Sequence, residues 1–66
     1  MPLVEVTLVA GRSGDQIRAL IGAVHTAVCG ALQAEPATVR VIVREVPATH
    51  WAAGGVTIHE RREAGD

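Results

Sequence analysis

At the start of the chain, in residues 2–9, successive side chains are expected to alternate between two faces. Val4, Val6 and Leu8 share one of these faces. A period of two predicts a β-strand, and the opposite face is also largely apolar. We therefore expect this strand to be covered on both sides. A second run rich in β-branched residues, 39–46, predicts another strand.

Between these strands, apolar residues recur three and four positions apart, which predicts an amphipathic helix of about five turns. Ser13 and Gln16 have the spacing of a capping box, with Ser13 as the N-cap. Glu35-Pro36 is expected to end the helix, because the residue before a proline is driven out of the helical conformation. The apolar face consists of Ile17, Leu20, Ile21, Val24, Val28, Ala31 and Leu32.

A strand, a helix and a strand joined by short connections predict an α/β fold, a right-handed β-α-β unit with parallel strands. Residues 47–51 are typical of a turn or a short 3₁₀ segment. Gly54-Gly55 predicts a tight turn into an extended piece, residues 56–58. Residues 59–66 are expected to be a polar, fraying tail of a single domain that spans residues 1–66.

A two-stranded sheet with one helix leaves one face and both edges uncovered. The chain has 66 residues, of which 48% are hydrophobic, and its one cysteine, Cys29, cannot form an internal disulfide. So short a chain buries only a modest fraction of its surface. We therefore expect an obligate homo-oligomer in which copies of the chain cover one another.

The remaining composition narrows the classes of partner and ligand. A formal net charge of −1 argues against nucleic acid, and the short apolar stretches argue against a membrane span or a signal peptide. A cytoplasmic protein, encoded in a GC-rich bacterial genome, is expected. The histidines and Cys29 match no zinc-site spacing, so no metal is expected, and His25 and Cys29 are interpreted as packing residues.

Pro2 directly follows Met1. One interpretation is structural, because a proline at the start of a strand removes no ladder bond. The other is chemical: if Met1 is cleaved, Pro2 carries a secondary amine, and burial among apolar groups would lower the pKa of that amine. A neutral amine could act as a general base, whereas a retained Met1 would turn it into an amide without basicity.

These features occur together in an order that resembles the 4-oxalocrotonate tautomerase family of the tautomerase superfamily, over roughly residues 2–58. The resemblance implies a β-α-β protomer with a C-terminal hairpin, dimers with a four-stranded sheet, and a hexamer of three dimers. It also implies cofactor-free enol–keto tautomerisation of a 2-hydroxy-dienoate dicarboxylate such as 2-hydroxymuconate. The motifs that carry it are Met1-Pro2, Gly11-Arg12-Ser13, Val39-Arg40-Val41-Ile42, and His50-Trp51 ahead of Gly54-Gly55.

The resemblance also implies roles for four residues. Pro2 matches the catalytic proline, and Arg12 matches the arginine that binds the distal carboxylate. Arg40, supplied by a neighbouring subunit, matches the arginine that holds the 2-keto and C1 carboxylate end. Trp51 replaces an aromatic, usually Phe, that lines the pocket. Without the resemblance, Arg12 would be a solvated loop residue. For Arg40 the structural interpretation is an edge charge or a salt bridge to Glu5 or Glu45. A ligand-binding role is favoured over it, because an arginine in a valine-rich strand is costly to bury unless it is paired.

Several departures from the family pattern leave alternatives open. Ala52-Ala53 replaces a bulkier pair, and Arg44 has no counterpart, so we interpret Arg44 as part of a structural ion pair. Hydratase-like and dehalogenase-like members carry a water-activating carboxylate where this chain has Ala53, which argues against those reactions. A non-catalytic oligomeric scaffold is a further alternative, favoured if Met1 is retained or if Trp51 fills the pocket.

Overall fold

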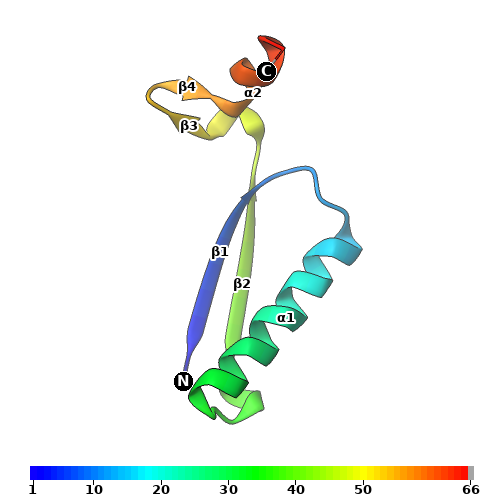
Figure 1. Cartoon of the computed structure of the whole chain (residues 1–66), viewed down its shortest axis with the longest axis vertical. Helices are drawn as coiled ribbons and strands as arrows, with labels where there is room; N and C mark the ends of the chain where they lie inside the picture. Colours follow the sequence, from blue (N-terminus) through cyan, green and yellow to red (C-terminus); the bar gives the residue numbers. More distant parts are fainter. Residues whose placement is uncertain (66) are drawn as a thin grey trace.

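The computed structural model describes residues 1–65 (Figure 1). Residues 3–46 form the predicted β-α-β unit, in which two parallel strands lie side by side and one long helix runs along one face. A small antiparallel hairpin and a short helix follow at the far end of the strands. The elements are β1 (Leu3–Val9), α1 (Gly14–Leu32), β2 (Arg40–Val46), β3 (Ala52–Ala53), β4 (Val56–Thr57) and α2 (Ile58–Glu63).

Strands β1 and β2 pair in a continuous parallel register that runs from Leu3 opposite Arg40 to Val9 opposite Val46. On β1, exposed and half-buried residues alternate, because successive side chains of a strand point to opposite faces. The half-buried side chains belong to the face covered by α1. The opposite face of the sheet, which we call the open face, presents Leu3, Glu5, Thr7, Arg40, Ile42 and Arg44.

Helix α1 begins with the predicted capping box. The Ser13 hydroxyl accepts the Gln16 N–H at 3.1 Å, and the Gln16 side chain accepts the Ser13 N–H at 2.9 Å. The helix ends at Leu32, earlier than Pro36 alone predicted, because Gln33 adopts a left-handed conformation with φ 51°. A left-handed residue terminates a helix before a more distant proline can do so.

The C-terminal segment differs from the sequence prediction. Gly54 and Gly55 form the expected turn, with φ values of 59° and 80° that suit a two-residue hairpin loop. Beyond it, Ile58 is not extended, and residues 58–63 form helix α2 where an irregular tail was expected from residue 59. Its own capping box was overlooked: the Thr57 hydroxyl accepts the Glu60 N–H at 3.0 Å, and Glu60 accepts the Thr57 N–H at 3.1 Å. Asp66 lies outside the described residues.

A single chain encloses little of its apolar surface. Within residues 1–65, Val39 alone is buried, with an exposed fraction of 8%. The radius of gyration is 15.3 Å, whereas a compact domain of this length has about 11 Å. Leu3 is 56% exposed on the open face of the sheet and Ile42 is 41% exposed there. The protomer therefore has the uncovered apolar surface from which self-association was predicted.

Residues 1–65 contain no helix that is both long and apolar enough to cross a membrane.

Candidate active site

Two of the predicted site residues meet where the parallel strands begin. The backbone N–H of Arg40 donates to the carbonyl oxygen of Pro2 at 2.9 Å. Pro2 is half-buried, and Arg40 is exposed on the open face of the sheet. The guanidinium of Arg40 donates through Nη1 to the carbonyl oxygen of Ala37 at 2.8 Å. This end of the protomer therefore places a proline immediately before β1 and an arginine at the start of β2.

Arg12 lies at the opposite end of β1. Its Nη1 donates to the carbonyl oxygen of Val9, the last residue of the strand, at 3.1 Å. The strand has seven residues, and each residue advances a strand by about 3.3 Å, so β1 is about 20 Å long. The guanidinium of Arg12 is therefore separated from Pro2 of the same chain by about the length of the strand.

Trp51 lies beyond the same end as Arg12. A 3₁₀ turn, Ala48–His50, confirms the prediction for this segment and leads from β2 into Trp51 and the hairpin. The Trp51 carbonyl accepts the N–H of Ile58 at 2.8 Å, and its side chain is half-buried. Figure 1 shows the hairpin and α2 at the end of the molecule away from the N-terminus. One chain thus separates Pro2 and Arg40 from Arg12 and Trp51.

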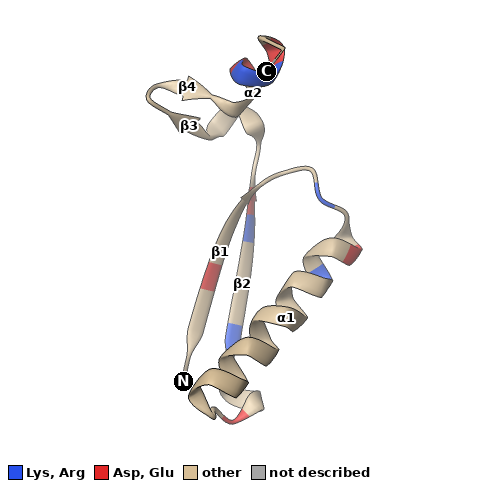
Figure 2. Cartoon of the chain, viewed as in Figure 1, with Lys and Arg blue, Asp and Glu red and all other residues tan. Residues whose placement is uncertain are grey.

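The basic residues of the protomer are spread over both ends of the sheet. Figure 2 shows them near both ends of β2, in the connection between β1 and α1, early in α1 and in α2. An anion a few ångströms long cannot contact Pro2 and Arg12 of one chain across about 20 Å. A site that uses all four residues requires the start of one chain's sheet to meet the far end of another's.

Arg44 forms the ion pair predicted for it. Its Nη2 lies 3.4 Å from a carboxylate oxygen of Glu5, and both side chains are about half exposed. A pair with this exposure contributes at most about 1 kcal/mol to stability. Arg40, on the same face, instead bonds to the Ala37 carbonyl.

The histidines have structural contacts, as the sequence indicated for His25. The His25 ring donates through Nε2 to the carbonyl oxygen of Pro36 at 3.1 Å, and the Cys29 sulfur lies 3.7 Å from the same nitrogen. His50 contacts the Thr49 hydroxyl within the 3₁₀ turn. His59 lies in α2, not in an irregular tail, and faces Glu63 at 3.8 Å. Among residues 1–65, no three His, Cys, Asp or Glu side chains are grouped as a metal site would require.

Comparison with known proteins decides the family. The family described as "Tautomerase enzyme" matches residues 2–61 of this chain. The chain belongs to the tautomerase family. It is 48% identical over 56 residues to a probable tautomerase of Ralstonia nicotianae. The aligned region covers 85% of this chain and 80% of that protein. It is also 38% identical over 55 residues to a 2-hydroxymuconate tautomerase of Stutzerimonas stutzeri, covering 83% and 87% of the two chains.

Two solved structures share the fold of this tautomerase closely. TomN, a 4-oxalocrotonate tautomerase homologue of the tomaymycin biosynthetic pathway, superposes with a TM-score of 0.94 at 40% identity. That match covers 98% of this chain and all of TomN. A heterohexameric 4-oxalocrotonate tautomerase from Chloroflexus aurantiacus gives a TM-score of 0.86 at 40% identity, over 91% and 97% of the two chains. The resemblance found in the sequence is confirmed, and the protein is an isomerase by class.

Proposed function

We propose that this tautomerase catalyses the cofactor-free enol–keto tautomerisation of 2-hydroxy-dienoate dicarboxylates, of which 2-hydroxymuconate is the type. The similarity to the 2-hydroxymuconate tautomerase of Stutzerimonas stutzeri supports this substrate class. The observation that carries the proposal is the position of Pro2. It stands half-buried immediately before β1, so that removal of Met1 would leave its amine at the start of the sheet.

In the proposed reaction, the neutral secondary amine of Pro2 removes the proton of the 2-hydroxyl group. The electrons of the enol shift along the diene to form the 2-keto group, and the prolinium returns a proton to the vinylogous carbon. The reaction moves one proton from oxygen to carbon and shifts the electrons of the diene, so it needs no cofactor. Such a transfer needs a positioned base and a positive charge where the oxygen of the enolate develops its own charge.

The arginines supply that charge and the binding contacts. Arg40, supplied by a neighbouring subunit, holds the 2-keto and C1 carboxylate end, because a guanidinium pairs with a carboxylate through two parallel hydrogen bonds. Arg12 binds the distal carboxylate, and Trp51 forms the apolar wall that keeps the amine poorly solvated. Ala53, with no carboxylate, gives the hairpin no group to activate water.

The proposed enzyme is a homo-oligomer, and we expect a hexamer built from three dimers. Support comes from the separation of about 20 Å between Pro2 and the Arg12 guanidinium within one chain, which one small substrate cannot bridge. The Chloroflexus aurantiacus relative is a heterohexamer, which favours the same number of chains. The partners we expect are therefore a small anionic substrate and further copies of the chain.

Removal of Met1 tests the proposal, because only the processed chain has the amine of Pro2. Intact-mass measurement should show loss of Met1. The processed protein should tautomerise 2-hydroxymuconate, and Pro2→Ala, which keeps a primary amine, should lose about 10²–10⁴ in rate. A form extended by one residue ahead of Pro2 should be slower than Pro2→Ala, since its Pro2 nitrogen is an amide.

Sedimentation must first show that the extended form keeps the oligomeric state of the processed one. If it then turns over as fast, Pro2 is not the base. If all forms of the folded oligomer lack activity on dienoate dicarboxylates, the scaffold alternative replaces the enzyme.

A further inference from the structure

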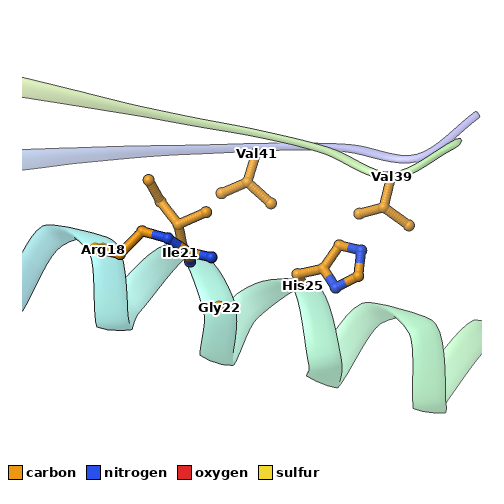
Figure 3. Close-up of a pocket in the computed structure, with 6 residues that line it drawn as sticks. All are labelled: Arg18, Ile21, Gly22, His25, Val39 and Val41. Atoms are coloured by element: carbon orange, nitrogen blue, oxygen red, sulfur yellow. The ribbon is translucent and has the colours of Figure 1, made fainter. Parts of the chain in front are cut away.

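A cleft of about 290 Å³ lies between α1 and β2 (Figure 3). It opens on the helix-covered face of the sheet, whereas the side chain of Arg40 belongs to the open face. None of its lining residues has a role in the tautomerisation proposed above. The residues that line it are Arg18, Ile21, Gly22, His25, Val39 and Val41.

Gly22 contributes a stretch of bare helix backbone to the lining of the cleft. Figure 3 shows Ile21 and Val41 pointing toward one another, and His25 and Val39 doing the same one turn further along α1. Gly22 lies between these two contacts and has no side chain to fill the space. A Cβ added there would lie 3.4 Å from Nη1 of Arg18 and, apart from the neighbouring residues and backbone of its own helix, would meet no other atom within 4 Å. The guanidinium therefore lies against the bare helix backbone at the floor of the cleft.

The two polar side chains of the cleft differ in whether they already have a hydrogen-bond partner. Within residues 1–65, Arg18 makes no hydrogen bond or ion pair. His25 is already engaged, because its Nε2 bonds to the Pro36 carbonyl at 3.1 Å. The opposite wall is apolar and includes Val39, the most buried residue described. The cleft thus combines one available cation with an aliphatic wall.

We propose that this cleft binds a small aliphatic monocarboxylate of about four carbons. The carboxylate pairs with the Arg18 guanidinium, which suits its planar fork of donors. The alkyl chain lies over Gly22 against Val39 and Val41. A dicarboxylate fits poorly, because its second charge would face the valines without a partner. This ligand class distinguishes the cleft from the proposed active site, which takes an anion at each end.

Butyrate is the probe, titrated into the ¹⁵N-labelled oligomer as purified and followed by two-dimensional NMR. Saturable shifts are expected at the amides of Gly22, Val39 and Val41. Affinity should rise about fourfold for each methylene from acetate to butyrate, as apolar burial requires. Arg18→Gln should weaken butyrate about tenfold, because it removes a charged hydrogen-bond donor. The matched control Arg62→Gln, in exposed α2, should leave the affinity unchanged.

Two further measurements separate the cleft from other carboxylate sites and from simple apolar binding. A protein carrying both Arg12→Gln and Arg40→Gln should retain the butyrate shifts at the cleft. 1-Butanol should bind at least tenfold more weakly than butyrate, since it has no charge for Arg18. Gly22→Leu should abolish the shifts by filling the gap; if that variant does not fold, the Arg18→Gln and Arg62→Gln pair decides.

The proposal is overturned by equal affinities of Arg18→Gln and Arg62→Gln for butyrate. It is also overturned by butanol binding as well as butyrate, or by shifts that vanish with the two active-site arginines. The proposal is also overturned if no saturable shift appears at the cleft. This would occur if a second copy of the chain covers it.

Discussion

The backbone N–H of Arg40 donates to the carbonyl oxygen of Pro2 at 2.9 Å, so the first residue of β2 is fixed to the residue that precedes β1. The bond uses the carbonyl of Pro2 and not its nitrogen. It therefore leaves that nitrogen available and is compatible with either the presence or the removal of Met1. The position of the proposed base is set by the same parallel pairing that sets the position of Arg40.

Arg40 and Arg44 offer a matched pair of substitutions on one strand. Arg40→Ala should lower both kcat and kcat/KM, with kcat falling about 10²-fold, because in the proposed reaction its charge stabilises the developing enolate. Arg44→Ala should leave both constants nearly unchanged, since Arg44 is paired with Glu5 at 3.4 Å. Steady-state kinetics with 2-hydroxymuconate measure both variants. If Arg44→Ala lowers kcat and kcat/KM strongly and Arg40→Ala leaves both unchanged, the roles assigned to the two arginines must be exchanged.

Mixed oligomers test whether the site combines different chains. Pro2→Ala and Arg12→Ala chains, each impaired alone, are unfolded, mixed in equal amounts and refolded together. If Pro2 and Arg12 of one site come from different chains, about a quarter of the sites regain both native residues. If both come from one chain, no site does. The quantity measured is kcat/KM at low substrate concentration, compared with each variant refolded alone.

Dilution should unfold this protein, because a single chain encloses so little apolar surface. At micromolar concentration, sedimentation should show only multiples of the 6.9 kDa chain, and the thermal midpoint should rise with protein concentration. Helical circular dichroism should disappear together with the oligomer. A folded monomer at micromolar concentration would contradict the argument from exposed surface, whereas a stable dimer would correct only the number of chains.

Helix α2 should loosen in acid. The hydrogen bond from the backbone N–H of Thr57 is the main reason that the pKa of Glu60 lies below its usual 4.5. A lowered pKa means that the ionised carboxylate stabilises the fold above pH 4.5, and that this contribution is lost as the pH falls through the lower value. Amide hydrogen exchange within residues 58–63 should therefore accelerate, relative to its intrinsic rate, only below about pH 4.5.

Glu60→Gln is the control for that measurement. Glutamine can still accept the N–H of Thr57 but does not titrate, so the acid-dependent part of the exchange should disappear. If Glu60→Gln shows the same acid dependence as the unchanged protein, another group is responsible.

Local patterns predicted most of the protomer. The alternation in residues 2–9 and the Ser13–Gln16 box gave the first strand and the helix start, because each depends only on neighbours in sequence. Helix α2 was missed although Thr57 and Glu60 have the same capping spacing as Ser13 and Gln16. The polar composition of residues 59–66 is typical of a solvated tail, and it conceals the cap that precedes this segment.

The site was less accessible to sequence reasoning, because its geometry depends on distances along the strands. The resemblance grouped Pro2, Arg12, Arg40 and Trp51 as one site, but only the length of β1 shows that one chain holds them at two ends. The cleft at Gly22 had a weak signal, an arginine four residues before a glycine and a histidine three residues after it. That spacing puts all three on one helical face, yet the apolar wall comes from β2.

The parallel register also determines when a newly synthesised chain can begin to form its sheet. Leu3 pairs with Arg40, 37 residues later (40 − 3), so the sheet cannot begin to form until the whole helix and both connections have left the ribosome. Non-local pairing of this kind is slow, because the chain must lose the entropy of closing a long loop before any strand contact can offset that loss. During that delay, the valine-rich segments of newly made chains are exposed to one another. Folding and assembly therefore compete with aggregation, and the concentration of nascent chains governs which prevails.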